Sequence, residues 1–235
     1  MKFEVGSFAH IYNRGNRKQP IVRDAKDKWH FLQVLYYLNH QTSLLNPFRE
    51  LRERELLMSE INNPFAWPKQ WDTRSPLVKI LTFKLRENHF HLILKQEVEN
   101  GIQKFMQRIG VAMAKRFNER YQEVGSLFQG RYKGKIIEKD EYIMYLSVYI
   151  QVKNAFEEYP GGLEKALQEF DRAFEWAIKD PYNSLGDYAG NRNSSIIDKD
   201  VLGAMFPTPQ SYKEFTKQCL SDMNFDEKLD KFRLD

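Results

Sequence analysis

Several features are scarce in this sequence of 235 residues, and each scarcity excludes a class of protein. The single cysteine, Cys219, excludes an intrachain disulfide framework and a cysteine-cluster zinc site. Uninterrupted apolar runs such as 92–94 fall far short of the about 20 residues that a transmembrane helix needs. Met1 to Val5 include no apolar stretch of signal-peptide length. We therefore expect a cytoplasmic protein without membrane contact.

The composition is that of a globular protein, with 42% hydrophobic and 29% charged residues. The net charge of +4 is mild, but the basic residues are concentrated in the middle of the chain. Residues 101–135 hold eight Lys or Arg against two Asp or Glu, whereas 156–180 hold seven acidic residues against three basic ones. The central concentration fits either a solvated helix face or a surface that binds an anionic partner.

Local patterns predict alternating strands and helices in the first two thirds of the chain. We expect a strand over 3–12, a helix from Asp24 to about 39, and a hairpin formed by 77–85 and 90–94. A helix over 100–121 follows, with Asn100 and Gln103 as a capping box, then a short strand within 125–137. Asp140 is expected to cap a helix that runs through Ile150.

This order favours an α+β fold, namely a ferredoxin-like antiparallel sheet with packed helices. Residues 1–155 would form that domain, with an insertion at about 40–76. Residues 156–235 would form a mostly helical C-terminal extension, which includes a helix with a capping box at Ser211 and Glu214.

The clearest chemical signal is the His89-Phe90-His91 tripeptide in the second strand of the hairpin. Residues i and i+2 of a strand share a face, so both imidazoles would lie on one face, about 7 Å apart along the strand. Phe90, Leu92 and Leu94 would then face a core on the other side. Such a pair holds a metal ion or is simply two packed histidines.

The ligand types favour a hard divalent ion, Mg²⁺ or Mn²⁺, if phosphate supplies further oxygens. A zinc hydrolase would usually need a third protein ligand at a recognisable spacing, and no His-Glu-x-x-His pattern occurs. The helix after Asp140 carries Tyr145 and Tyr149 on one face. Beside a metal-bound phosphate a tyrosine is a reasonable nucleophile.

Together these segments resemble the REP-associated tyrosine transposases, which lie within the HUH single-strand DNA nucleases of IS200-like type. The similar segments are 12–21 (YNRGNRKQPI), 87–95 (ENHFHLILK), 127–133 (LFQGRYK) and 149–152 (YIQV), together with 180–185 (DPYNSL) in the extension. Several motifs in the same order are far more specific than any one of them.

The resemblance implies that His89 and His91 bind the metal and that Tyr149 is the nucleophile. Tyr149 would attack a phosphodiester of single-stranded DNA and leave a 5′-phosphotyrosine and a free 3′-OH. Rejoining would reverse that step, so no external energy source is needed. The absence of a Walker lysine motif agrees with this.

One position departs from the family pattern. The family usually has an amide residue four positions after the tyrosine, and this amide completes the metal site. Here that position is Lys153, which when protonated cannot ligate a metal. Three hypotheses follow. Asn154 or Gln151 substitutes if the helix bends or rotates; Lys153 binds the scissile phosphate; or the protein binds DNA with weak or lost cleavage.

The implied partner is single-stranded or hairpin DNA, which requires cations for phosphates and aromatic faces for unpaired bases. Arg131 and Lys133 are the first candidates for backbone contacts. Further candidates are Lys135, Arg14, Arg17, Lys104, Arg108, Lys115, Arg116 and Lys153. The alternative function is a non-catalytic module that binds hairpin DNA or structured RNA. The residues leave open whether the protein is a monomer or a homodimer.

Overall fold

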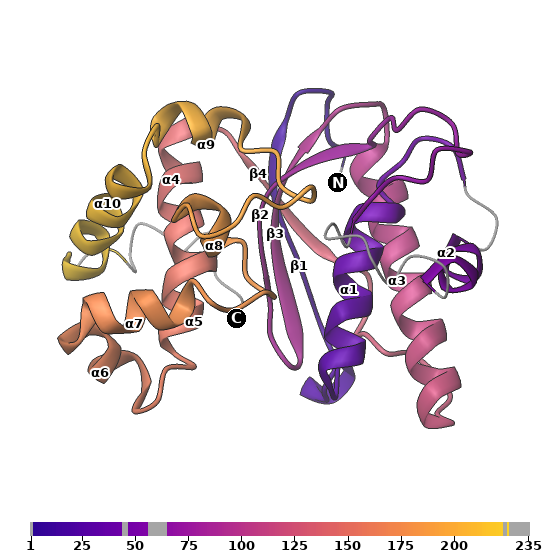
Figure 1. The fold of residues 1–235 in the computed structure, drawn as a ribbon, viewed down its shortest axis with the longest axis horizontal. Coiled ribbons are helices and arrows are strands. Elements are labelled where there is room, and N and C mark those ends of the chain that lie inside the picture. The colour runs from indigo at the N-terminus through magenta and orange to yellow at the C-terminus, as the bar shows by residue number, and fades with distance from the viewer. Residues whose placement is uncertain (1, 44–46, 56–64, 223–224, 226–235) are drawn as a thin grey trace.

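The computed structural model describes residues 2–43, 47–55, 65–222 and 225. Its centre is a four-stranded antiparallel sheet of strand order β2-β3-β1-β4, with helices on both faces (Figure 1). The strands are β1 (Phe8–Arg14), β2 (Val78–Leu85), β3 (His89–Gln96) and β4 (Lys133–Ile137). Helices connect β1 to β2 and β3 to β4, so the predicted α+β, ferredoxin-like fold is confirmed.

The helices form two layers, one on each side of the sheet (Figure 1). One layer contains α1 (Ala25–Tyr37), α2 (Pro47–Glu55) and α3 (Gly101–Tyr121). The other contains α4 (Asp140–Val148), the π-helix η2 (Tyr149–Lys153), α5 (Asn154–Phe156), α6 (Gly162–Gln168), α7 (Phe170–Ala177), α8 (Leu185–Tyr188), α9 (Asp200–Met205) and α10 (Pro209–Ser221). Among the described ranges, no helix has both the length and the apolar character needed to span a bilayer.

Each face of the sheet has its own core, because alternate residues of a strand point to opposite sides. Phe90, Leu92 and Leu94 of β3 belong to the core shared with α1 and α3. Ile93 belongs to the core shared with α4 and the helices after it. The predicted alternation of β3 is therefore confirmed, and it puts the two histidines on the side of α4.

The segment after 155 is joined tightly to the sheet. Residues 182–184 run along β2, with hydrogen bonds from Leu85 N to Tyr182 O (2.9 Å) and from Ser184 N to Phe83 O (3.0 Å). The buried Lys84 of β2 forms ion pairs with Glu158 (2.8 Å) and Asp180 (2.7 Å). The boundary at 155/156 and the insertion at 40–76 stay predictions, and 44–46 and 56–64 lie outside the described residues.

Several predicted element ends are wrong, although Asp24 does cap α1 by accepting a hydrogen bond from Asp27 N. The first strand runs over 8–14 rather than 3–12. Asn100 adopts a left-handed conformation without a side-chain cap, because Gln96 Oε1 accepts the hydrogen bond of Ile102 N instead (3.1 Å). Asp140 is the first residue of α4 rather than its cap.

The predicted capping box in the extension is displaced by three residues. Thr208 and Ser211 form it at the start of α10, where Pro209 is the first helical residue. Proline suits that position because its missing N–H has no helical partner there. Ser211 therefore contributes as the third helical residue and not as the cap.

Candidate active site

The two histidines of β3 lie at its N-terminal end, opposite the C-terminal half of β1. His91 pairs with Tyr12 and His89 with Arg14 in the antiparallel register, so these four side chains share one face. The His89 and His91 rings are 5.2 Å apart between centroids and nearly perpendicular. The sheet therefore brings the imidazoles together on the face covered by the α4 layer.

Hydrogen bonds fix the orientation of both rings. His89 Nδ1 lies 2.6 Å from Asn88 Oδ1, and Asn88 Nδ2 donates to Lys18 O (3.1 Å). An amide oxygen only accepts, so Nδ1 of His89 carries the proton and Nε2 keeps its lone pair. His91 Nδ1 lies 3.0 Å from Nε2 of His10, a buried residue of β1.

Burial keeps both imidazoles neutral. Desolvation, together with the positive charges of Arg86, Arg14 and Lys84, lowers the pKa of His89 to about 3. Desolvation likewise holds the pKa of the fully buried His91 well below its ordinary value, with His10 and His89 adding to the effect. A neutral imidazole is the form that ligates a metal ion.

The donor set fits a divalent ion that takes further ligands from a substrate. His91 Nε2 is buried and has no hydrogen-bond partner among the described residues. Such an orphaned nitrogen, fixed through its Nδ1, is the arrangement of a metal-binding histidine. Within the described ranges, no group of three or more His, Cys, Asp or Glu is placed to hold a metal. Any remaining ligands would be an amide, water or phosphate.

Tyr149 stands over this pair from the helical layer. Its ring lies 5.8 Å from that of His91, at an interplanar angle of 89°. The Lys153 ammonium lies 5.8 Å from the centroid of the Tyr149 ring. Tyr145, the other candidate on this helix, contacts Phe215 and Phe225 of the extension instead. Of the two tyrosines, Tyr149 is the one in contact with the histidines.

The helix that carries Tyr149 is a π-helix from that residue onwards, and this changes which residue lies one turn below it. The Asn154 N–H donates to Tyr149 O, an i to i+5 bond that inserts one extra residue into the turn. Asn154 Nδ2 also donates to Tyr149 O (2.8 Å). Asn154 thus takes the place that residue 153 would hold in an α-helix.

Asn154 is linked to the histidine strand through Arg86 in the β2–β3 turn. Arg86 Nη1 donates to Asn154 Oδ1 (3.3 Å), and the Arg86 backbone N–H donates to His89 O (2.8 Å). Glu157 and Glu158 form ion pairs with the same guanidinium. Sequence reasoning missed Arg86, although its place just before the histidine pair was a usable signal.

Gln151 is directed away from the histidines. Its Nε2 donates to Ser184 Oγ (2.9 Å), and its Oε1 accepts from the Tyr212 hydroxyl (2.6 Å). Both ends of this buried amide are therefore occupied by the extension. Of the two amides proposed for the metal site, only Asn154 lies one turn below Tyr149.

The predicted DNA-binding cations divide between the two faces. Lys133 and Lys135 of β4 pair with Tyr12 and His10, so they share the face of the histidines, as Arg14 does. Arg131 is exposed just before β4, and Arg17 is exposed in the 3₁₀ turn after β1. Lys133, Lys135 and Arg14 therefore lie on the histidine face, whereas Arg131 lines a pocket with Gln107 and Gly110 of α3.

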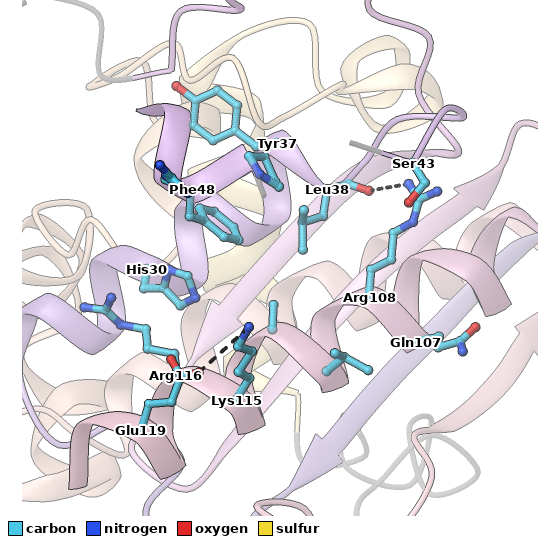
Figure 2. Close-up of a pocket in the computed structure, with 14 residues that line it drawn as sticks. His30, Tyr37, Leu38, Ser43, Phe48, Gln107, Arg108, Lys115, Arg116 and Glu119 are labelled. Atoms are coloured by element: carbon cyan, nitrogen blue, oxygen red, sulfur yellow. Dashed lines mark hydrogen bonds and ion pairs between the residues drawn. The ribbon is translucent and has the colours of Figure 1, made fainter. Parts of the chain in front are cut away.

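The remaining cations, Lys104, Arg108, Lys115 and Arg116, belong to α3 in the opposite layer. Arg108, Lys115 and Arg116 line a pocket of about 520 Å³ between α1, α2 and α3, together with His30 and Phe48 (Figure 2). The Arg108 guanidinium donates to Leu38 O (3.1 Å) and to His40 O. The fold does not bring these residues to Tyr149.

Comparison with known families gives a match to the segment that contains these residues. Residues 71–153 match the model of the family described as "Transposase IS200 like". That segment contains His89, His91 and Tyr149 and ends at Lys153. The match confirms the resemblance inferred from the motifs: over this segment the chain is similar to the IS200-like transposases.

Among solved structures, the chain is similar to a REP-associated tyrosine transposase bound to a REP hairpin. The identity is 9% and the TM-score 0.44, over 84% of this chain and 91% of that chain. At that TM-score the similarity carries no argument about the site. No curated protein matches the sequence.

Proposed function

We propose that this protein is a metal-dependent endonuclease and strand transferase that acts on single-stranded, hairpin-forming DNA. The observation that carries the proposal is the contact between the Tyr149 ring and His91, whose buried Nε2 lacks a hydrogen-bond partner among the described residues. A nucleophile beside an unsatisfied, neutral ligand atom is the constellation of metal-assisted phosphoryl transfer.

In this mechanism the Tyr149 oxygen attacks the phosphorus and forms the P–O(Tyr) bond. The bond from phosphorus to the 3′ oxygen breaks, and that oxygen takes up a proton as a 3′-OH while the phenol proton passes to solvent. His89, His91 and Asn154 would hold Mg²⁺ or Mn²⁺, which supplies charge stabilisation at the scissile phosphate. Rejoining is the reverse attack of a 3′-OH on the phosphotyrosine.

Lys153 has its own role in the proposal. The π-helix leaves its ammonium beside the Tyr149 ring rather than one turn below it. There a point charge would stabilise the negative charge of the phosphate and of the attacking oxygen. Two of the hypotheses on position 153 are then compatible. Asn154 would supply the amide of the metal site, and Lys153 would supply the cation that binds the scissile phosphate.

The DNA would approach along the face of β4. Lys133, Lys135, Arg14 and Arg17 would bind backbone phosphates near the cleaved bond, and Arg131 would bind those beside the pocket that it lines with α3. The α3 cations and the pocket in Figure 2 lie in the other layer, so they would contact a separate part of the hairpin. Phe48, a half-buried residue of that pocket, offers a ring on which an unpaired base would stack.

The test is a denaturing-gel assay with hairpin DNA from the flanks of the coding region and either Mg²⁺ or Mn²⁺. A slowly migrating covalent adduct is expected for the wild type and for Tyr145→Phe, and none for Tyr149→Phe, which should still bind the hairpin. An adduct that persists in Tyr149→Phe would move the nucleophile elsewhere. Tight binding with no adduct in either metal would overturn the proposal.

That last outcome would support the second candidate, a non-catalytic module for hairpin DNA or structured RNA. One observation favours it: Asn154 Oδ1 accepts a hydrogen bond from Arg86, so the amide oxygen is occupied by a cation. In such a module, the positively charged face would act without the metal. Metal-independent binding with unchanged affinity in His89→Ala would identify it. A zinc hydrolase, the third alternative, would instead require Zn²⁺.

A further inference from the structure

The π-helix under Tyr149 is held from behind by the C-terminal extension. Side chains two positions apart on a helix point to nearly opposite sides. Tyr149 therefore faces the sheet histidines, while Gln151 faces the extension. Gln151 is fully buried, and three groups of the extension contact it. They are the Tyr212 hydroxyl at Oε1 (2.6 Å), Ser184 Oγ at Nε2 (2.9 Å) and Asn183 Nδ2 at the main-chain oxygen (2.7 Å).

These contacts are themselves anchored to the sheet. Ser184 Oγ donates to Phe83 O (3.0 Å) and accepts from Phe83 N (2.9 Å). Asn183 forms an isolated antiparallel bridge with Lys84. The extension thus connects β2 to Gln151 through one short segment, while Tyr212 of α10 reaches Gln151 from the other side. We call Asn183, Ser184 and Tyr212 the clamp.

A π turn needs such support. It is rare because its hydrogen-bond geometry is less favourable than that of the α-helix, and it occurs mostly where function requires it. Here it brings Asn154 rather than Lys153 under Tyr149. In the π turn, the Gln151 carbonyl accepts a hydrogen bond from an amide of the extension. The Gln151 side chain has two further hydrogen-bond partners there, and these contacts offset the cost of the π turn.

We propose that the clamp is a positioning element that maintains the π turn and thereby directs Tyr149 at the histidine pair. The catalytic part of this inference rests on the proposed function, but the structural part does not. The extension would then be part of the active-site architecture, and loosening the clamp would slow cleavage without weakening DNA binding.

The extension offers a matched pair of variants. Tyr212 and Tyr188 are both buried, their rings are 5.3 Å apart, and each hydroxyl makes a buried hydrogen bond. The Tyr212 hydroxyl reaches Gln151 (2.6 Å) and also Ser147 of α4 (3.2 Å), whereas the Tyr188 hydroxyl donates to Leu81 O of β2 (2.8 Å). Tyr212→Phe and Tyr188→Phe therefore remove the same group from the same extension, but only the first touches the π turn.

The first measurement is hydrogen exchange of the full chain without DNA or metal. In Tyr212→Phe, the amide of Asn154 and its neighbours in 149–154 should exchange at least about tenfold faster than in wild type. Tyr188→Phe should leave that segment unchanged. Equal protection of 149–154 in wild type and both variants, or an equal loss in both, would overturn the proposal whether or not the protein cleaves DNA.

The second measurement is single-turnover adduct formation at saturating protein, if the wild type forms the adduct. Tyr212→Phe should lower the rate at least about tenfold at unchanged hairpin affinity, because a misdirected nucleophile slows the chemical step and not binding. Tyr188→Phe should retain the wild-type rate. Gln151→Glu keeps an acceptor for the Tyr212 hydroxyl, so its rate of adduct formation should lie between those of wild type and Tyr212→Phe. Equal rates in wild type and Tyr212→Phe would contradict the catalytic part alone.

Discussion

The two faces of the sheet use the same strands for different purposes. The face toward α1 and α3 is apolar: Phe90, Leu92 and Leu94 of β3 pack there among buried aliphatic and aromatic side chains. The face toward α4 and the extension holds buried polar groups, including His10, His91 and Lys84. Comparing the two shows that a single strand can divide its residues between stability and chemistry by simple alternation.

The difference has an energetic consequence. An apolar face is stabilised by burial alone, whereas each buried imidazole or ammonium needs hydrogen bonds or ion pairs to offset its desolvation. On the α4 face the imidazoles of His10 and His91 are partners of each other, whereas Glu158 and Asp180 of the extension are the partners of Lys84. Docking of the extension is therefore coupled to the stability of this face.

Adjacent residues of β3 give the largest contrast between the faces. Phe90→Ala should lower the free energy of unfolding by about 4 kcal/mol, because it empties a fully buried site beside Phe31 and Phe128. His91→Ala should cost only about 1 to 2 kcal/mol, mainly by removing one hydrogen bond of the buried His10, but should abolish Mn²⁺ binding and adduct formation. Urea unfolding and metal titration check this. Equal destabilisation by both would remove the contrast.

Lys84 tests how far the α4 face depends on the extension. Lys84→Met should lower the free energy of unfolding by about 3 kcal/mol, because the buried ammonium pairs with both Glu158 and Asp180. The matched control is Lys115→Met on α3, whose pair with Glu119 is exposed and contributes less than about 0.5 kcal/mol. A Lys84 variant as stable as the control in urea would show that the ion pairs do not hold the extension.

The helical layer of α1 and α3 also contains a buried imidazole, that of His30, and its protonation makes stability depend on pH. Desolvation, with the charge of Arg116, lowers the pKa of His30 to about 4 from 6.5. As the pH falls below 6.5, the unfolded chain binds a proton that the folded chain refuses, so stability is lost down to about pH 4. His30 should account for about 2 kcal/mol of lost stability between pH 7 and pH 5.

The check is urea unfolding of wild type and His30→Gln at both pH values. The variant should lose correspondingly less stability on acidification, because glutamine does not titrate. Parallel losses in the two proteins would show that His30 is solvated in the folded state.

The smallest expected effects concern the two groups of cations. Replacing Lys133 and Lys135 with Gln should weaken hairpin binding and reduce the slope of log affinity against log salt by about one for each lost phosphate contact. Lys104 and Lys115 on α3, replaced in the same way, are the control for the other layer. If only the α3 pair changes the slope, the DNA lies on the opposite face from Tyr149.

Much of the fold could be predicted because its signals are local. The period of two in β3, the cap at Asp24 and the short turn between β2 and β3 each depend on neighbouring residues. The predicted helix caps at Asn100 and Ser211 are wrong because the residues that determine these helix starts lie outside the predicted capping boxes. Gln96 supplies the acceptor at the start of α3 from the preceding strand, and Pro209 determines where α10 begins.

By itself, the sequence determined the order of strands and helices and the shared face of His89 and His91, because short spacings encode them. It also predicted Tyr149 as the nucleophile through the motifs. Only the tertiary structure placed Asn154, rather than Lys153, one turn from Tyr149, because it formed a π turn in which Gln151 contacts partners 32 and 61 residues away. It also divided the cations between two faces, since their distance in space follows from strand pairing and helix packing rather than from spacing along the chain.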